Sequence, residues 1–253
     1  MCGRFALEMT VEDMTALFDV VDVEPFPARY NIPPTEPIMM VIRGHPRPPG
    51  SNQPANRVVL VRWGFVPGWA KDPGRMPLLI NARSETAAEK STFKAAMRHR
   101  RTLVPASGFY EWRREGSGKA QAYWVRPREG RFVAFAGLME TWSDANGSEI
   151  DTGAILTTSA AGELAAIHER APVVIQPRDF SRWLDCRGNE PRDVADLMRP
   201  VTPDFFEAIP VSDKVNKAAN RGPEIQARVE PPVTKTQPKQ QEAPEEACQM
   251  RLL

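Results

Sequence analysis

The second residue of the chain, Cys2, carries the most reactive combination of groups in the sequence. A small residue after Met1 favours removal of Met1, which would leave an α-amine and a thiol on one residue. An α-amine has a pKa of about 7.7–8.0, so near pH 7 a useful fraction is neutral and can attack an aldehyde to form a Schiff base. The thiol can then close a five-membered thiazolidine ring. Cys2 therefore predicts an aldehyde trap.

Three other interpretations of Cys2 stay open at this point. A cysteine near a chain end can be a small apolar residue and nothing more. It can also be an N-terminal nucleophile for amide hydrolysis, released by cleavage of its own Met1. Such a peptidase needs a peptide groove and an oxyanion hole, which the sequence does not reveal. The remaining alternative is a non-covalent single-strand binding module that uses only aromatic and arginine side chains.

Two further residues have side chains suited to proton transfer. Glu111 stands among aromatic residues, where desolvation should raise the pKa of its carboxyl group. Such an acid could open a sugar ring and move protons at a Schiff base. His168 ends a short helical pattern, and its near-neutral pKa suits protonation of a ring oxygen. A solvent-facing strand glutamate and a helix-closing histidine are the structural alternatives.

Polar and aromatic residues elsewhere could contact a nucleic acid. Asn81 and Arg83 face the same side of an extended segment, where Arg83 could bind a phosphate and Asn81 a sugar or backbone amide. Arg4 is a second candidate phosphate ligand, whereas Asn31 fits either a substrate contact or a turn, and we favour the turn. The aromatic residues expected to stack on bases, at about 1–3 kcal/mol each, are Trp63, Phe65 and Trp69. The basic run Arg98-His99-Arg100-Arg101 is explained by a solvated helix end. If this run borders the Cys2 cleft, it would instead supply a positively charged surface for DNA.

The length, charge balance and cysteine content of the chain restrict the class of protein. The 253 residues suit one globular domain, and 33 lysines and arginines against 32 aspartates and glutamates require any polyanion site to come from local charge. Three cysteines without paired spacing disfavour a disulfide scaffold or zinc site and predict a cytoplasmic protein. Neither a membrane-spanning apolar run nor a metal or phosphate-loop motif is present in the sequence, so we expect no membrane association, metal or nucleotide cofactor.

The elements that must position these residues predict an α+β fold. We expect a single domain, 1–226, with a mainly antiparallel, curled or barrel-like sheet flanked by short helices, and a disordered tail, 227–253. A capping box at Thr10 should begin a helix whose buried face extends to Val21. The prolines of 24–37 predict irregular structure, and 44–56 a surface loop. The predicted strands are 38–42, 58–65, 102–106, 110–113, 122–125, 132–139, 154–158 and 205–211, and the predicted helices are 84–90, 92–98, 162–169, 178–184 and 192–198.

Several segments occur in an order that resembles the SOS-response-associated peptidase (SRAP) domain family. The segments are Met1-Cys2-Gly3-Arg4-Phe5, Arg29-Tyr30-Asn31-Ile32-Pro33-Pro34-Thr35, Trp63-Gly64-Phe65-x-Pro67-x-Trp69, Ile80-Asn81-Ala82-Arg83-Ser84-Glu85-Thr86, Gly108-Phe109-Tyr110-Glu111-Trp112, Ile155-Leu156-Thr157-Thr158, His168-Glu169-Arg170-x-Pro172 and Pro210-Val211-Ser212 with Val215-Asn216. Together they cover nearly all of residues 1–225. The departures are Leu103, Ser107 and Ala171, where the family commonly carries Cys, Asp and Met.

The resemblance implies a protein that senses abasic sites in single-stranded DNA. It implies a covalent thiazolidine crosslink through Cys2 that shields the lesion, after autocatalytic or assisted removal of Met1. Glu111 and His168 match the family's catalytic positions, and Asn81 and Arg83 match contacts to the lesion and a phosphate. We expect a monomer in the cytoplasm, or with the nucleoid if bacterial. The alternative function is an N-terminal-nucleophile cysteine peptidase acting on proteins.

Overall fold

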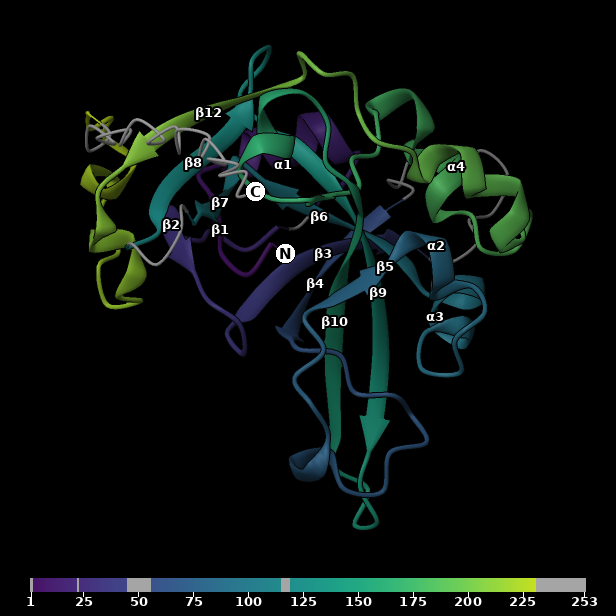
Figure 1. Cartoon of the computed structure of the whole chain (residues 1–253). Coiled ribbons are helices and arrows are strands. Elements are labelled where there is room, and N and C mark those ends of the chain that lie inside the picture. Colours follow the sequence, from purple (N-terminus) through teal and green to yellow (C-terminus); the bar gives the residue numbers. More distant parts are fainter. Residues whose placement is uncertain (1, 22, 45–55, 115–118, 231–253) are drawn as a thin grey trace, which may run out of the picture.

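The computed structural model describes residues 2–21, 23–44, 56–114 and 119–230. These ranges form short strands, short α-helices and 3-10 helices, the last labelled η (Figure 1). The strands are β1 (Phe5–Leu7), β2 (Arg29–Ile32), β3 (Pro37–Arg43), β4 (Asn56–Trp63), β5 (Asn81–Arg83), β6 (Arg101–Ala106), β7 (Gly108–Arg113), β8 (Gln121–Pro127), β9 (Val133–Ser143), β10 (Glu149–Ser159), β11 (Arg170–Pro172) and β12 (Phe206–Val211). The helical segments are α1 (Val11–Phe18), η1 (Pro73–Arg75), α2 (Ser84–Ala87), α3 (Lys94–His99), η2 (Gly162–Ala166), η3 (Pro177–Asp179), α4 (Phe180–Leu184), η4 (Pro191–Met198), η5 (Asp213–Asn216) and η6 (Pro223–Gln226).

Five strands close into a barrel, in the order β10, β4, β3, β6 and β9, with β9 pairing back onto β10. All neighbours run antiparallel except β4 and β10. The interior is tightly filled, since a Cβ added at Gly137 would lie 2.4 Å from the Thr102 side chain. The far ends of β9 and β10 extend beyond the barrel as a long hairpin (Figure 1). The predicted α+β fold with a mainly antiparallel, barrel-like sheet is confirmed.

A second sheet, β12-β8-β7-β1-β2, is antiparallel throughout and lies beside the barrel. Side chains alternate along β7, so Phe109 joins the main core while Tyr110 joins a smaller cluster on the opposite face. Both faces of β7 are therefore covered. Glu111 shares the face of Phe109 and is directed into the protein rather than toward solvent.

The N-terminal segment is held in this second sheet as strand β1. The Tyr110 N–H donates to the Arg4 carbonyl at 2.9 Å, and the Ser107 N–H donates to the Ala6 carbonyl at 2.8 Å. Phe5 packs edge-on against Trp63, with 5.2 Å between ring centroids. The residues after Cys2 are thus anchored by both backbone and side chains, and they carry Cys2 into the protein.

The local predictions near the N-terminus are confirmed in part. The Thr10 side chain accepts from the Asp13 N–H and the Asp13 carboxylate accepts from the Thr10 N–H, which is the predicted capping box. The helix, however, ends at Phe18, and Val21 is half exposed, so Val21 does not belong to its buried face. The left-handed backbone at Asp19 turns the chain away before that position.

Two predicted irregular segments need correction. Residues 24–37 are not wholly irregular, because Arg29–Ile32 forms β2 and pairs with β1, with prolines only on either side of the strand. The predicted tail starts too early, because Arg228 bridges to Val211 and the Val229 N–H donates to the Pro210 carbonyl. Residues 231–253, and 45–55 of the predicted loop, lie outside the described residues. Among the described helices, none has both the length and the apolar character needed to cross a bilayer.

Gly108 is the position at which the second sheet is most closely packed. A Cβ there would lie 2.3 Å from the Val125 carbonyl oxygen and 2.7 Å from the Trp124 ring. We expect Gly108→Ala to lower the free energy of unfolding by about 1–3 kcal/mol, because overpacking forces the backbone to shift. Urea denaturation measures this. Gly74→Ala is the matched control, since its Cβ would meet only the Asp72 side chain, at 3.3 Å, and equal losses at both glycines would contradict the packing argument.

Candidate active site

Cys2 lies where strand β5 and the second sheet meet. The Asn81 Nδ2 on β5 donates to the Cys2 carbonyl oxygen at 2.9 Å. The register of β1 on β7 pairs Phe5 with Phe109, so continuing it toward the N-terminus places Gly3, the neighbour of Cys2, opposite Glu111. Burial raises the pKa of the Cys2 thiol, and the charge of Glu111 raises it further. The structure therefore brings Asn81 and Glu111 together at Cys2.

The Glu111 side chain is almost completely enclosed, with 3% of the residue exposed. Burial raises the pKa of its carboxyl group above the ordinary value, and the charge of His168 partly opposes that shift. The predicted raised pKa is confirmed, and the solvent-facing alternative is wrong because both faces of β7 are covered. His168 thus lies within electrostatic reach of Glu111.

The His168 ring is oriented by the backbone that follows it. The Arg170 N–H donates to His168 Nδ1 at 2.9 Å. The Arg170 carbonyl oxygen also lies 3.2 Å from His168 Nδ1, so the backbone of Arg170 presents both a donor and an acceptor to this ring nitrogen. His168 follows η2, and its own N–H donates to the Leu164 carbonyl. The half-buried ring therefore combines the predicted helix-closing position with an orientation fixed by the Arg170 backbone.

Sequence reasoning missed an ion pair behind His168. Arg170 donates from Nη1 and Nη2 to the two carboxylate oxygens of Glu85, at 2.6 and 2.8 Å. The Arg170 side chain is only 11% exposed, and it also donates to the Thr157 carbonyl on β10. This pair connects α2, which follows Asn81 and Arg83, to β11, which follows His168. Both residues stand in the motifs that carry the family resemblance, but their mutual contact required the fold.

The arginines predicted to bind phosphate occupy different environments. Arg83 is exposed at the end of β5. The hydrogen bond from Arg170 is the main cause of the lowered pKa of Glu85, and the charge of Arg83 adds a smaller effect in the same direction. Arg4 is half-buried and donates from Nη1 to Asn31 Oδ1 and the Val215 carbonyl. Contact of either arginine with a phosphate stays a prediction, and the geometry leaves Arg83 more accessible.

Asn31 does not form the predicted turn. It is a buried residue of β2 whose Nδ2 donates to the carbonyls of Val215, Lys217 and Asn220, at 2.8–3.2 Å. Asn31 thereby ties the segment around η5 to the second sheet.

Two of the three predicted base-stacking rings are core residues. Trp63 has no exposed surface and donates from Nε1 to the Ile80 carbonyl, and Phe65 is 2% exposed and packs on Phe93. Neither ring presents a face to a base, so these two predictions are wrong. Trp69 is 60% exposed and remains available. The spacing of aromatics with Gly and Pro could not separate core rings from surface rings.

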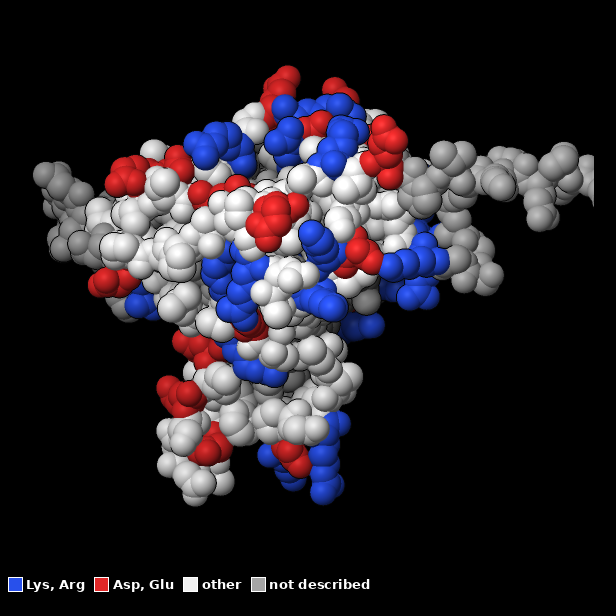
Figure 2. Space-filling view, turned by 90° about the vertical axis from the view of Figure 1, so that its left-hand side faces the viewer, with Lys and Arg blue, Asp and Glu red and all other residues white. Residues whose placement is uncertain are grey.

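The basic run before β6 is occupied by contacts within the protein. Arg98 pairs with Glu190, Arg100 pairs with Glu140, and Arg101 is buried. The conditional prediction of a positive track from this run is therefore not supported. Figure 2 shows basic and acidic side chains interspersed over the face it presents, in keeping with the balanced charge of the chain. Within the described ranges, no group of three or more His, Cys, Asp or Glu is placed to hold a metal ion.

The family model described as SOS response associated peptidase (SRAP) matches residues 1–218. The chain belongs to the SRAP family. A relative named abasic site processing protein YoqW, from Bacillus subtilis, is 33% identical over 228 residues, which cover 89% of this chain and 98% of that protein. The protein of the same type named YedK, from Escherichia coli, is 32% identical over 234 residues, with 89% and 98% covered.

Solved structures share the SRAP fold of this chain. A protein from Bacteroides thetaiotaomicron superposes with a TM-score of 0.74 at 23% identity, covering 90% of this chain and all of that one. A phage-related protein from Bordetella bronchiseptica gives a TM-score of 0.66 at 28% identity, covering 84% of this chain and 95% of that one. The arrangement of the barrel and the second sheet is therefore found in experimental structures.

Two of the residues that depart from the common SRAP pattern are accommodated by the fold. Ser107 lies between β6 and β7, and its Oγ accepts a hydrogen bond from the Glu8 N–H at 2.8 Å. A polar side chain is therefore hydrogen-bonded at this position. Ala171 is buried and pairs with Thr158 across β11 and β10.

Proposed function

We propose that this SRAP protein processes abasic sites in single-stranded DNA by forming a covalent thiazolidine crosslink through Cys2 after removal of Met1. The observation that carries the proposal is the placement of Asn81 and Glu111 at Cys2, with His168 within electrostatic reach of Glu111. Relatives that cover nearly the whole chain are named abasic site processing proteins. The crosslink would shield the lesion from cleavage. This function would place the protein on cellular DNA, and one monomer would be sufficient to form the crosslink.

The order of bond formation follows from the environment of Cys2. Because burial raises the pKa of the thiol, little thiolate is present and the α-amine is the first nucleophile. The amine adds to C1′ of the ring-opened sugar, and loss of one water gives the imine. The thiol sulfur then adds to the same carbon, and its proton is transferred to the imine nitrogen. The product is a thiazolidine, and one water is released overall.

Glu111 and His168 supply the proton transfers in this scheme. The imidazole of His168 can protonate the ring oxygen of the deoxyribose, while Glu111 accepts the proton of the C1′ hydroxyl group, which exposes the aldehyde. A carboxyl group with a raised pKa can also return a proton to the leaving water during imine formation. The Asn81 hydrogen bond holds the Cys2 carbonyl, so the attacking amine has a defined direction.

Contacts to the rest of the DNA strand are assigned to exposed groups. Arg83 is on the same strand as Asn81 and can bind a phosphate next to the lesion. Trp69 can stack on a base. Because phosphate contacts release counterions, binding should weaken as salt rises.

A cysteine peptidase that acts on proteins is the second candidate function, and the family description favours it. The same Cys2 would then attack a peptide carbonyl. The raised pKa of its thiol works against that role, because a peptidase attacks with the thiolate, whereas the crosslinking reaction begins with the α-amine.

Intact mass spectrometry of the full chain tests the proposal. The expected spectrum shows loss of Met1 and, after addition of a single-stranded oligonucleotide with one abasic site, the protein–oligonucleotide mass less one water. The same oligonucleotide with an intact base is the control. Turnover of peptides without a DNA adduct would instead establish the peptidase, and equal affinity for both oligonucleotides without an adduct would establish a non-covalent binding module.

The Glu85–Arg170 ion pair should affect the rate through His168. We expect Glu85→Gln to slow crosslink formation about fivefold, since a pair of this kind contributes about 1 kcal/mol and its loss frees Arg170. The pH–rate profile should also shift, because the Arg170 N–H no longer holds His168 Nδ1 as firmly. The control is Glu89→Gln at an exposed position one turn on, for which rate and profile should be those of the wild type. A lower rate with an unshifted profile would contradict the positioning role.

A further inference from the structure

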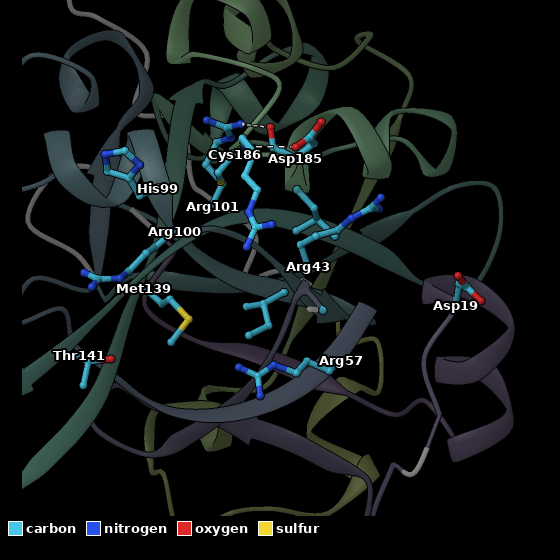
Figure 3. A pocket seen from close by; sticks show the side chains of 14 residues that line it. Asp19, Arg43, Arg57, His99, Arg100, Arg101, Met139, Thr141, Asp185 and Cys186 are labelled. Carbon is cyan, nitrogen blue, oxygen red and sulfur yellow. Dashed lines mark hydrogen bonds between the residues drawn. The ribbon is translucent and has the colours of Figure 1, made fainter. Parts of the chain in front are cut away.

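A pocket of about 840 Å³ lies at the opposite end of β3 and β4 from the Cys2 site (Figure 3). Its walls come from the ends of β3 and β4, the junction of α3 and β6, strand β9 and the turn after α4. This volume is within the range of small-molecule sites, about 300–1,000 Å³. In Figure 3, Arg57 enters from one side and Arg101 and Asp185 line the opposite side. The pocket is thus a concave site built by segments far apart in sequence.

The pocket carries an excess of positive charge. Five arginines line it against two aspartates, Asp19 and Asp185. Of these arginines, Arg100 is paired with Glu140. Three others, Arg43, Arg57 and Arg187, are exposed and form no ion pair with any carboxylate in the described part of the chain.

The remaining arginine, Arg101, is buried without a carboxylate partner among the described residues. It is 2% exposed, and its guanidinium donates only to backbone carbonyls, at 2.7–3.0 Å. Those carbonyls belong to Trp183, Met97, Asp185 and Asn189. Buried charges in proteins are normally paired, so Arg101 leaves a positive charge at the wall of the pocket that an anion could balance.

Asp185, the pocket-lining carboxylate whose charge acts on Arg101, is already committed to local structure. Asp185 Oδ1 accepts hydrogen bonds from the N–H groups of Arg187 and Gly188, at 3.1 and 3.0 Å. These bonds, together with the charges of Arg43 and Arg101, lower the pKa of Asp185. The field inside the pocket therefore favours anions.

We propose that this pocket binds a compact, phosphate-bearing small molecule of nucleotide size. Arginine is the side chain best suited to phosphate, because its planar fork donates two parallel hydrogen bonds. The apolar walls formed by Ile42, Met139 and Leu184 can contact the uncharged part of such a molecule. A half-open pocket of this size suits a compact anion better than a continuous DNA strand, which needs an extended groove.

Isothermal titration calorimetry on the full chain at low salt tests the proposal, with pyrophosphate and dATP as probes. Both should bind, and dATP should bind more tightly because its base reaches the apolar walls. We expect Arg57→Gln and Arg187→Gln each to weaken dATP binding about tenfold, since each removes charge-assisted hydrogen bonds. Arg178→Gln is the matched control, because this side chain is 84% exposed on another surface and its loss should leave binding unchanged.

The crosslinking reaction separates this site from the Cys2 site. Arg57→Gln and Arg187→Gln should leave the rate of adduct formation with an abasic oligonucleotide as it is in the wild type. If neither probe binds, or if the three variants bind dATP equally, the proposal is wrong. It is also wrong if the two pocket variants weaken binding of an unmodified single strand as much as they weaken binding of dATP, because the pocket would then be part of a DNA path.

Discussion

Replacing Cys2 with alanine should abolish the stable crosslink to abasic DNA while leaving the reactive amine in place. Alanine is also small, so Met1 should still be removed and the α-amine should still form an imine. Without the sulfur the imine cannot close to a ring, and adducts that survive on a denaturing gel should fall by about 100-fold or more. Addition of borohydride should restore a Cys2→Ala adduct by reducing the imine.

This pair of measurements separates the two functional groups of Cys2. Cys186→Ala is the matched control, because Cys186 is a half-buried free cysteine on the turn after α4. It should crosslink as the wild type does. A Cys2→Ala protein that forms as much borohydride-independent adduct as the wild type would refute the thiazolidine mechanism. Failure of borohydride to trap any adduct would refute attack by the α-amine.

Glu111→Gln should slow crosslink formation about 100-fold, the typical contribution of one positioned acid or base. The amide keeps the size and shape of the carboxyl group but cannot exchange a proton. Affinity for the abasic oligonucleotide should stay close to that of the wild type, because Glu111 is enclosed and acts at the reacting atoms rather than on the phosphates or bases of the DNA. Single-turnover rates on denaturing gels and fluorescence anisotropy measure the two quantities. Rates equal to those of the wild type for both formation and reversal would contradict the role of Glu111.

Although Glu111→Gln should slow the reaction, it should not lower the free energy of unfolding at high pH. Because the pKa of Glu111 is raised in the folded protein, the folded state binds this proton more tightly than the unfolded state. The resulting stabilisation is fully present below the ordinary glutamate pKa and is lost as pH rises through the folded pKa. Glu111→Gln removes this loss, so at pH 8 its free energy of unfolding should equal or exceed that of the wild type. A clearly less stable variant would mean that the carboxylate makes contacts that the amide cannot replace.

The resemblance to the SRAP family, more than the residue types, identified the candidate site. Cys2, Glu111 and His168 each admit a structural interpretation when taken alone, and the order of the SRAP motifs favoured the chemical one, which stays a prediction. The Glu85–Arg170 pair was not predictable, since the two residues are 85 positions apart and meet only because β10 lies between β5 and β11. Contacts of this kind depend on strand order, which spacing along the chain does not reveal.

The wrong predictions share a physical cause. Trp63, Phe65 and Arg101 have side chains that serve equally well on a surface or in a core, and tertiary packing decided between the two. Strand β2 was missed for a related reason. The prolines around Arg29–Ile32 argue against a long strand, but four residues at the edge of a sheet need no donor from the flanking positions. Strand β6 and the first eight residues of β9, which are fully covered, were predicted because their apolar runs leave few alternatives.

Enclosure of Cys2 between the barrel and the second sheet has a consequence for chemoselectivity. A free aminothiol in solution would condense with any small carbonyl metabolite and would be open to oxidation. A sulfur with no exposed surface and a raised pKa is a poor target for both, because oxidants and electrophiles react mainly with accessible thiolate. The fold therefore protects the aminothiol of Cys2 from oxidants and small carbonyl compounds, so that its reactivity is kept for a sugar that fits the site.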